Sequence, residues 1–480
     1  MRKNKIIKHE TLLIGAGEAA LELLHDIKRQ TNCTLSICCI IDDDAAKWDK
    51  EICGIPVVGG RDKIIQTVME YQIEYIIFGI PSASADQRKD ILEICNKTGC
   101  RLKMLPSLYQ LVNPDVNISL VRDVHIEDLL GREQSSVDLN KITTYLEQKT
   151  VMVTGGGGSI GSELCRQIAK AKPRKLIIFD IYENNAYEIQ QELIRNNPSL
   201  DLEVVIGSVR SLERLESVME QFRPDIIYHA AAHKHVPLME NSPHEAIKNN
   251  VFGTYNVALA AIKYNCERVV LISTDKAVNP TNIMGASKRL CEMIIQVMNQ
   301  KNSTDFVAVR FGNVLGSNGS VIPLFRKQIE EGGPVTVTHP DIIRFFMTIP
   351  EAVSLVLEAG VDAQGGEIFV LDMGAPVRIL DMAENLIRLL GYIPGVDIKI
   401  EFTGLRPGEK LYEEILLDEE NLRRTSNHRI YITQPLIIDV DKFEEELSEL
   451  KSIAYDEGSD IKKAVHKIVP EYQIYQERRC

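Results

Sequence analysis

Four side chains that can bind or move protons gather in the sixteen residues Ser273–Lys288, STDKAVNPTNIMGASK. They are the hydroxyl of Thr274, the carboxylate of Asp275 and the amines of Lys276 and Lys288. The stretch follows an apolar run, so we expect it to begin where a buried strand ends. Parallel strands hold reacting groups at their carboxyl ends in α/β enzymes, although Asp-Lys pairs are also common in plain turns. The segments upstream decide between a catalytic centre and a solvated loop.

A glycine-rich turn is the most specific cofactor signal in the chain. A strand expected at 150–154 runs into GGGGSIG and then into a helix expected at 162–169. Glycine at the GxxGxxG positions permits a tight turn and lets backbone N–H groups approach a pyrophosphate. The predicted pyrophosphate-binding residues are Gly155, Gly158, Ser159, Ile160 and Gly161.

The next expected strand, 175–179, ends in Asp180, nineteen residues after Gly161. A carboxylate there binds the adenosine ribose and disfavours a ribose phosphate, so the sequence predicts NAD rather than NADP. Small residues that follow two later strands would let the cofactor lie close to the backbone. These further cofactor-binding candidates are Ser208, Val209, Ala230, Ala231 and Ala232.

Polar residues follow the alanines and are candidates for the substrate side of the pocket. His233 and His235 flank Lys234. The two histidines suggest a metal site, but no third ligand is evident, so a polar pocket wall is favoured and no metal is expected. Asn250 begins the helix that leads toward the catalytic stretch.

A second, weaker glycine turn opens the chain. Gly15-Ala16-Gly17, with Ala20 at the third glycine place, follows a strand expected at 11–14. Further strands and helices alternate after it, expected at 35–41, 61–71, 75–79, 86–98 and 101–105. This pattern predicts a first doubly wound domain. Its GxGxxA turn alone does not distinguish a nucleotide-binding domain from an empty regulatory or packing domain.

The expected fold class is therefore α/β, with two doubly wound Rossmann-like domains. We expect an N-terminal domain over 1–130 and a linker over 131–149 that contains one short helix. The NAD-binding catalytic domain should span 150–417, with a smaller substrate-binding part mainly in 310–417. The remainder, 418–480, is acidic and helical, and its charge runs are typical of a solvated face.

Composition limits the class of protein. The 480 residues carry a net charge of −13, which disfavours sequence-independent binding to nucleic acid. The ten cysteines form no CxxC pair, which favours reduced thiols in the cytoplasm. There is neither a signal-peptide pattern nor an apolar run near the ~20 residues of a membrane helix. We therefore expect a soluble cytoplasmic protein without a membrane segment.

Several long motifs, in one order, carry a family resemblance. From Thr150 to about Glu414 the chain resembles the extended short-chain dehydrogenases/reductases. With its N-terminal domain it resembles the long bacterial UDP-N-acetylglucosamine 4,6-dehydratases of polysaccharide biosynthesis. The matching segments are TGGGGSIGSEL (154–164), HAAAHKHVPLME (229–240), NNVFGT (249–254), STDKAVNPTN (273–282), RFGNVLGSNGSVIP (310–323) and GLRPGEKLYEE (404–414). Relatives of this length usually carry membrane helices ahead of the first domain, so we expect a soluble member or the cytosolic part of an anchored enzyme.

The resemblance implies NAD-dependent dehydration of UDP-N-acetylglucosamine to a 4-keto-6-deoxy sugar. Carbon 4 is oxidised, water is lost across carbons 5 and 6, and hydride returns to carbon 6. Lys276 is then the candidate base at carbon 5, with a pKa lowered by burial and a second cation. Asp275 is the candidate acid for the departing hydroxyl, and a desolvated site would raise its pKa. Thr274 would bind the carbon-4 oxygen, and Lys288 the nicotinamide ribose.

One position departs from the superfamily pattern. The superfamily has Tyr four residues before the helix Lys, whereas this chain has Met284 there. A thioether cannot take a proton. Some long dehydratases also resemble this chain in carrying Met, so activity is still expected. Deprotonation at carbon 4 then falls by hypothesis to Asp275 or a water.

Downstream segments would bind the nucleotide half of the substrate. Asn313 resembles the family's diphosphate ligand, and Arg344 is interpreted as a phosphate or sugar clamp or as a domain-packing arginine. The remaining candidates are Thr336 and Thr338 beside the uracil, and Arg406 and Glu409 at the uridine end.

Two other functions stay open from the sequence. A nucleotide-sugar 4-epimerase would use the same scaffold, but it needs no Asp-Lys pair after Thr274 and retains the Tyr. A non-catalytic nucleotide-binding or assembly protein is disfavoured by the intact catalytic residues. We expect a homo-oligomer, a dimer or larger, and retention of configuration at carbon 5, by analogy with the relatives that share Met284.

Overall fold

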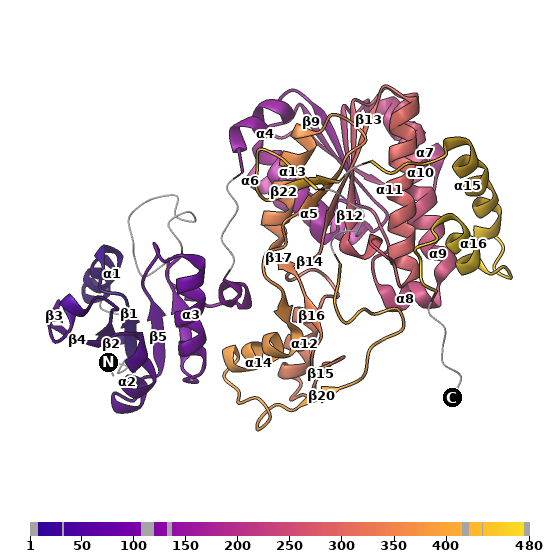
Figure 1. Cartoon of the computed structure of the whole chain (residues 1–480). Helices are drawn as coiled ribbons and strands as arrows, with labels where there is room; N and C mark the ends of the chain where they lie inside the picture. The colour runs from indigo at the N-terminus through magenta and orange to yellow at the C-terminus, as the bar shows by residue number, and fades with distance from the viewer. Residues whose placement is uncertain are drawn as a thin grey trace, which may run out of the picture. The chain divides into compact units, whose positions relative to one another are not determined.

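The computed structural model describes residues 8–30, 33–106, 120–131, 137–414, 422–433 and 435–474. The chain forms two compact units (Figure 1). Unit 1 comprises 1–133, 324–340 and 377–402, and unit 2 comprises 134–323, 341–376 and 403–480. Two segments that the sequence analysis placed in the catalytic domain thus cluster with the N-terminal domain. The expected boundaries near 130, 150 and 417 stay predictions.

Unit 1 is built on a seven-stranded sheet of order β3-β4-β2-β1-β5-β6-β7. Its central strands pair in parallel and are apolar, because both faces of such a sheet are covered. The strands are β1 (His9–Ile14), β2 (Leu35–Ile41), β3 (Glu51–Ile52), β4 (Ile55–Gly59), β5 (Tyr75–Phe78), β6 (Arg101–Met104) and β7 (Arg122–Asp123). The helices between them are α1 (Glu18–Arg29), α2 (Ile64–Glu70) and α3 (Ala85–Asn96), with short 3₁₀ turns at Ala45–Lys47, Arg61–Lys63 and Ile126–Leu130.

The later segments of unit 1 add α14 (Ile379–Leu389) and a small parallel pair, β15 (Val335–Val337) with β20 (Ile400–Phe402). Helix α14 packs against α3. The amide of Asn96 on α3 donates to the Asn385 carbonyl at 3.3 Å. This contact explains why 377–402 cluster with the N-terminal domain.

Unit 2 is built on a nine-stranded sheet of order β10-β9-β8-β11-β12-β13-β18-β22-β21. The first seven strands are parallel, and β22 and β21 complete one edge in antiparallel pairing. They are β8 (Thr150–Thr154), β9 (Lys175–Asp180), β10 (Leu202–Ile206), β11 (Ile226–His229), β12 (Arg268–Thr274), β13 (Asp305–Phe311), β18 (Ile368–Leu371), β21 (Arg423–Arg424) and β22 (Ile430–Thr433). The expected α/β class with two Rossmann-like sheets is confirmed.

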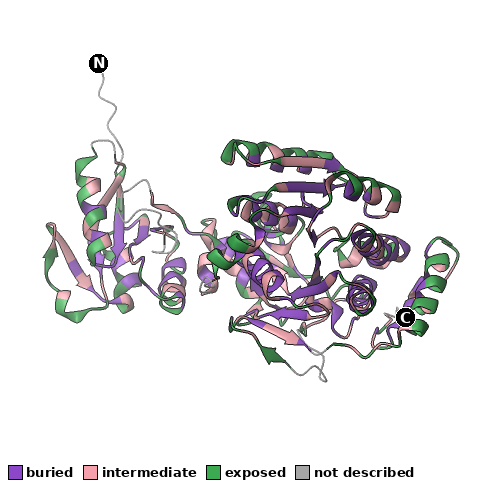
Figure 2. Cartoon of the chain, turned by 90° about the horizontal axis from the view of Figure 1, so that it is seen from above, coloured by how far each residue is buried: buried purple, intermediate pink, exposed green. Residues whose placement is uncertain are grey.

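Helices cover both faces of this sheet, and the strands between them are buried (Figure 2). The helices are α4 (Leu139–Leu146), α5 (Ser159–Lys170), α6 (Glu183–Asn196), α7 (Leu212–Phe222), α8 (Val236–Asn241), α9 (Pro243–Ala246), α10 (Phe252–Lys263), α11 (Ile283–Lys301), α13 (Ile349–Asp362), α15 (Val440–Ala454) and α16 (Ile461–Ile468). A π-helical turn, η6 (Ile247–Val251), precedes α10, and a 3₁₀ turn, η7 (Asp275–Ala277), follows β12. Unit 2 also contains β14 (Asn313–Val314), β16 (Ile343–Arg344) and β17 (Phe346–Met347). Helix α12 (Val321–Glu330) lies mostly in unit 1, to which β19 (Val377–Arg378) also belongs. None of the helices in the described ranges is long and apolar enough to cross a membrane.

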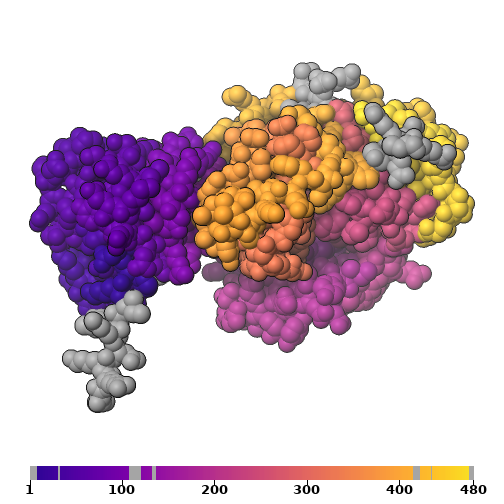
Figure 3. Space-filling model, turned by 90° about the horizontal axis from the view of Figure 1, so that it is seen from below, coloured from indigo at the N-terminus to yellow at the C-terminus, as the bar shows by residue number. Residues whose placement is uncertain are grey.

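The C-terminal helices are part of the core of unit 2. Phe443 and Leu447 on α15 and Val465 on α16 are buried in the same apolar cluster as Leu290 of α11. Figure 3 shows the yellow C-terminal helices lying beside the pink surface of this unit. Three glutamates of the acidic run at 444–449 are exposed, as the pattern predicts, whereas the Glu446 side chain is only 14% exposed.

A fully buried ion pair lies beneath the catalytic stretch. Arg310 on β13 donates to Glu292 on α11 at 2.9 Å, and both side chains are completely inaccessible to solvent. The Ser273 hydroxyl of β12 donates to the same carboxylate at 2.7 Å. Arg289 completes the network, binding Glu292 at 3.3 Å and Glu471 near the C-terminus at 3.0 Å.

We expect Glu292→Ala to destabilise the protein by about 3–5 kcal/mol, because it leaves the Arg310 charge buried and unpaired. Urea denaturation at neutral pH measures the loss. Glu444→Ala is a matched control, since its pair with Lys301 is 46% and 42% exposed and should contribute at most about 1 kcal/mol. Equal effects of the two substitutions would contradict this account of the buried pair.

Candidate functional site

The catalytic stretch, Ser273–Lys288, begins one residue before its first reactive side chain, Thr274. Strand β12 extends two residues beyond the expected end, so Thr274 is its last residue and pairs with Phe311 of β13. Asp275 and Lys276 follow in the turn η7, and Met284 and Lys288 lie on α11. The carboxyl end of the parallel sheet therefore carries the reactive residues, as predicted.

Asp275 is the centre of this group. Its side chain is fully buried, and its Oδ1 accepts from the Thr274 hydroxyl at 2.8 Å and from the Lys276 amine at 3.0 Å. Its Oδ2 is also buried but has no hydrogen-bond partner among the described residues. Gly312 lies on that side, and a Cβ there would come within 3.1 Å of Oδ2. A buried carboxylate oxygen without a partner is costly, which indicates a place for a ligand hydroxyl.

Lys276 is surrounded by acceptors. Its Nζ lies 3.2 Å from Asn313 Oδ1 and 3.5 Å from Glu413 Oε1, in addition to Asp275. Burial by itself lowers the pKa of Lys276, but the charges of Asp275 and Glu413 outweigh burial and raise the pKa above its usual value. The expectation of a lowered pKa is wrong for this ligand-free state, because two carboxylates face the amine.

The start of α11 is fixed from several sides. The Asn282 side chain caps the helix through Gly285 N at 2.8 Å, and Glu240 Oε1 accepts from Ile283 N at 2.6 Å. Gly285 is required by packing, since a Cβ there would lie 2.1 Å from the Lys276 carbonyl oxygen. These contacts hold α11 directly against the turn that carries Lys276.

Met284 and Lys288 are both buried on α11. Met284 packs in the apolar core of unit 2, so it places no titratable group beside the reactive residues. Burial lowers the pKa of the Lys288 amine. His229 at the end of β11 is bonded to Thr154 and Thr254, and burial, helped by the charge of Lys288, lowers the pKa of His229 to about 3.

The glycine turn has the geometry of a phosphate-binding loop. Gly155 has φ +69°, and a Cβ on it would lie 2.7 Å from Ala231 N. A Cβ on Gly161 would lie 2.0 Å from the Gly155 carbonyl oxygen. Gly158 caps α5 without a side-chain hydrogen bond, so the helix amides at Ser159 and Ile160 are available to an anion.

Asp180 lies where the sequence predicts it, at the end of β9. Its Oδ2 accepts from Gly157 N and its Oδ1 from Tyr182 N, both at 2.8 Å. The carboxylate therefore holds the glycine turn in shape, and its contact with a ribose stays a prediction. The other candidates follow β10 and β11 in the chain: Ser208, Val209, Ala230, Ala231 and Ala232. Of these, Ala230 and Ala231 lie directly against Gly155.

Asn250 differs from its expected role as a substrate ligand. It is buried, its Oδ1 accepts from His233 N at 2.8 Å, and its amide donates to His233 O and to Ser287 Oγ. We therefore interpret Asn250 as a residue that positions the loop after β11. His233 and Lys234 are exposed residues, but neighbouring atoms partly desolvate their titratable groups, and this desolvation lowers the pKa of each.

Arg344 also differs from the expected phosphate clamp. Its guanidinium is buried, donating to the carbonyls of Ile343 at 2.7 Å, Lys410 at 2.8 Å and Leu411 at 3.2 Å. It lies 3.4 Å from Glu409 as well. These contacts favour the packing alternative, since Arg344 ties the loop 404–414 to β16, and the clamp role stays a prediction.

This loop docks on the catalytic stretch. Thr281 Oγ1 and Asn282 Nδ2 both donate to the Gly408 carbonyl, at 2.9 Å and 3.1 Å. Glu409 accepts from Arg406 N and so stabilises the turn, whereas the Arg406 side chain is exposed at its tip. Asn313 is brought to Lys276, as described above. Thr336 and Thr338 belong to unit 1, where Thr336 bonds with Gln328.

Two contacts near the site had no counterpart in the sequence predictions. Glu413 reaches Lys276, although its place in the charged motif GLRPGEKLYEE resembles a solvated end. Ser159 Oγ, at the start of α5, accepts from Asn318 N at 3.1 Å. Both are contacts between segments far apart in the chain, and only the shared motifs could have directed attention to them.

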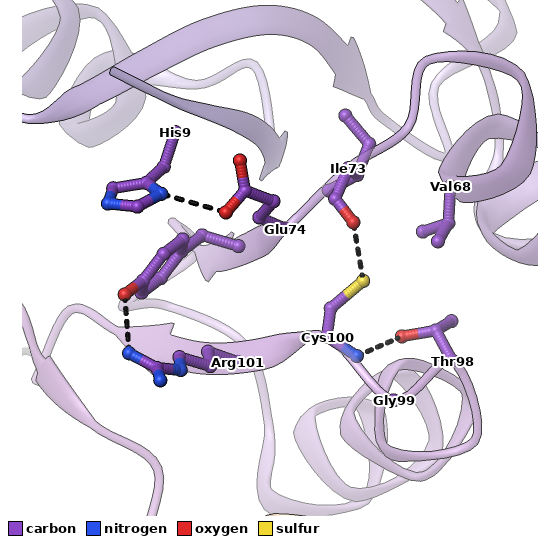
Figure 4. A pocket seen from close by; sticks show the side chains of 9 residues that line it. His9, Val68, Ile73, Glu74, Thr98, Gly99, Cys100 and Arg101 are labelled. Atoms are coloured by element: carbon purple, nitrogen blue, oxygen red, sulfur yellow. Dashed lines mark hydrogen bonds and ion pairs between the residues drawn. The ribbon is translucent and has the colours of Figure 1, made fainter. Parts of the chain in front are cut away.

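Unit 1 contains a separate pocket of about 370 Å³ at the amino ends of β1, β5 and β6 (Figure 4). Its polar groups pair with one another: His9 with Glu74 at 2.8 Å, and Arg101 with the Tyr75 hydroxyl at 2.9 Å. The Cys100 thiol donates to the Ile73 carbonyl. With these pairings, the pocket does not display the convergent unpaired groups that mark a catalytic site.

Sequence comparisons place these features in context. The family described as "Polysaccharide biosynthesis protein" matches residues 151–435, and a "CoA-binding domain" family matches residues 1–106. The capsular polysaccharide biosynthesis protein CapD of Staphylococcus aureus is 49% identical over 89% of this chain and 72% of its own length. The probable polysaccharide biosynthesis protein EpsC of Bacillus subtilis is 47% identical over 88% of this chain and 70% of its own length. A UDP-glucose 4-epimerase of Rickettsia canadensis is 40% identical over 57% of this chain and 79% of its own length.

Solved structures agree on the fold. Pen from Bacillus thuringiensis is 37% identical, with a TM-score of 0.56 over 62% of this chain and 89% of its own. DesIV of Streptomyces venezuelae, a dTDP-glucose 4,6-dehydratase solved with NAD bound, is 21% identical, with a TM-score of 0.50 over 63% of this chain and 97% of its own. The second likeness shows a shared fold alone. Together with the match over 151–435 and the identity to CapD, these findings show that the chain belongs to the polysaccharide biosynthesis protein family.

Proposed function

We propose that this protein is an NAD-dependent UDP-N-acetylglucosamine 4,6-dehydratase. The observation that carries the proposal is Asp275, whose Oδ1 is shared by Thr274 and Lys276 while its buried Oδ2 has no partner among the described residues. Elimination of water needs an acid and a base on one sugar ring, and this group supplies both. The polysaccharide names of CapD and EpsC support a nucleotide-sugar substrate.

NAD fits the glycine turn, because its crowded glycines and Asp180 form a cradle that a side chain would fill. The residues that would hold it are Gly155, Gly158, Ser159, Ile160, Gly161 and Asp180, with Lys288 at the nicotinamide ribose. When bound, NAD supplies the acceptor and later the donor of a hydride. The chain's own residues then have to move only protons.

The Thr274–Asp275 hydrogen bond offers a path for the carbon-4 hydroxyl proton. With Met284 in place of tyrosine, that proton passes to Thr274 Oγ1 as the Thr274 proton moves to Asp275 Oδ1. Asp275 then holds this proton on Oδ1 and can give it from the same oxygen to the departing carbon-6 hydroxyl, which leaves as water. The proton taken from the carbon-4 hydroxyl thus leaves in the released water, and Asp275 returns to its ionised form.

Lys276 is the proposed base at carbon 5. As an amine it takes the carbon-5 proton during elimination and returns it to carbon 5 when hydride reaches carbon 6. Its raised pKa means that it must first lose a proton, so the reaction should be favoured as pH rises toward that pKa. Asn313 and Arg406 are proposed for the diphosphate and uridine, and the uracil role of Thr336 and Thr338 stays a prediction. The oligomer and retention at carbon 5 stay predictions.

An epimerase is the second candidate, and the 40% identity to a UDP-glucose 4-epimerase favours it. Incubation with UDP-N-acetylglucosamine and NAD in deuterated water, followed by proton NMR, separates the candidates. Dehydration yields a new carbon-6 methyl signal. A galacto-configured product means epimerisation, and an unchanged substrate supports a binding protein; either result contradicts the proposal.

Asp275→Asn should slow both oxidation and elimination by about 10²–10⁴-fold, because the amide can neither accept nor return the proton. Single-turnover absorbance of the reduced cofactor measures the first step, and product analysis measures the second. Reduced cofactor formed at the wild-type rate would exclude Asp275 from the proton path of oxidation.

Thr274→Val should lower the oxidation rate by about 10²-fold or more, whereas Thr274→Ser, which keeps the hydroxyl, should retain most of it. Adding Met284→Tyr to the valine variant should restore oxidation, because an ionised tyrosinate can take the carbon-4 proton directly. The same single-turnover assay reads all three, and thermal melting confirms that Tyr is accepted in the core. Loss of oxidation in the serine variant, or no rescue in a folded double variant, contradicts the Thr274 path.

A further inference from the structure

Glu413 is a nearly buried carboxylate at the centre of the site that no motif assigns to a function. Its side chain is 5% exposed, and its Oε1 lies 3.5 Å from the Lys276 amine and 3.5 Å from Arg344 Nε. The neighbouring Glu414 is 50% exposed, pairs with Lys410 and accepts from Asn279 Nδ2 at 2.7 Å, without contacting Lys276. Two adjacent glutamates thus occupy opposite environments, and only Glu413 faces the reactive residues.

The contacts of Lys276 define one position for its amine. An ammonium has three N–H donors and no acceptor. Three oxygen atoms surround it: Asp275 Oδ1 at 3.0 Å, Asn313 Oδ1 at 3.2 Å and Glu413 Oε1 at 3.5 Å. They come from the turn η7, from β14 and from the loop 404–414. The site is therefore built around a protonated Lys276 held from three sides.

Arg344 fixes the loop that places Glu413 beside the Lys276 amine. Its guanidinium donates to the carbonyls of Lys410 and Leu411 and lies beside Glu409, so the loop is fixed from within unit 2. The same loop contacts the catalytic stretch through Gly408. Arg344 thus contributes by folding the loop, and Glu413 is the member of the loop that reaches the reactive amine.

We propose that Glu413 is a positioning residue for Lys276, which holds the amine against Asp275 and Asn313 and sets the pH at which it becomes a base. The role of Lys276 as the carbon-5 base rests on the proposed function; the contact of Glu413 with the amine does not. Glu413 touches neither the sugar nor the cofactor in this assignment, and it acts through Lys276.

The expected effect on pH dependence has a definite sign. The charged groups that face Lys276 are Asp275, Glu413 and, with the opposite sign, Arg344. Removing the Glu413 charge removes one stabilising partner of the ammonium, so Lys276 should lose its proton at lower pH. An opposite charge at this range is worth about 1–3 pKa units. Activity that needs neutral Lys276 rises with pH, so its acidic limb should move to lower pH by the same amount.

Glu413→Gln tests this inference, because the amide keeps the shape of the carboxylate and removes its charge. Glu414→Gln is the matched control, one residue away. The first readout needs no turnover: competitive acetylation of lysines across a pH series, with peptide mass spectrometry of Lys276 against the exposed Lys442. The second readout is the pH dependence of kcat for methyl formation from UDP-N-acetylglucosamine.

We expect the labelling midpoint of Lys276 to fall by about 1–3 units in Glu413→Gln and to stay unchanged in Glu414→Gln. Glu413→Asp, which keeps the charge but withdraws it by one methylene, should give a smaller fall and serves if the Gln variant does not fold. An unchanged or raised Lys276 midpoint in a folded Glu413 variant would overturn the proposal. If the wild-type protein forms no methyl product, the dehydratase assignment fails, and the labelling midpoint still decides the role of Glu413.

Discussion

The catalytic stretch depends on the buried pair Glu292–Arg310, which joins three elements beneath it. Arg310 lies on β13, Glu292 on α11, and Ser273 at the end of β12 donates to the same carboxylate. Separating a buried ion pair costs much free energy, because it leaves a buried charge without a partner. The pair therefore fixes the strand end that carries Thr274 relative to the helix that carries Lys288. Arg289 extends the network to Glu471, which explains why the C-terminal helices belong to the catalytic unit.

The reactive side chains are held by specific hydrogen-bond acceptors and not by the overall charge of the protein. Asp275 receives a hydroxyl and an amine on one oxygen and leaves the other without a partner among the described residues. Lys276 is balanced by Asp275 and Glu413. A net charge of −13 could not hold an anionic nucleotide sugar by itself. Such a substrate has to be held by a few local polar and cationic side chains, and the proposed NAD by backbone amides at the glycine turn.

Much of the fold was predictable from sequence, because buried parallel strands are continuous apolar runs. The strands expected at 35–41 and 150–154 have the predicted bounds. The glycine turn and Asp180 were predictable because glycine spacing and one acid serve local geometry. Contacts between distant segments were not predictable. The sequence suggests an anion clamp at Arg344, whereas in the structure its guanidinium donates hydrogen bonds to the carbonyls of Lys410 and Leu411. The predicted direction of the Lys276 pKa shift was wrong for the same reason, because Glu413 comes from a loop far along the chain.

The central claim is that one site oxidises carbon 4 and returns the same hydrogen to carbon 6 after water is lost. UDP-N-acetylglucosamine deuterated at carbon 4 tests it directly, with mass spectrometry and NMR of the product from ordinary water. The account predicts that the deuterium reappears in the carbon-6 methyl group, which then carries one deuterium. Deuterium that returns to carbon 4 in a 4-epimeric sugar, or that stays in unchanged substrate, would contradict it.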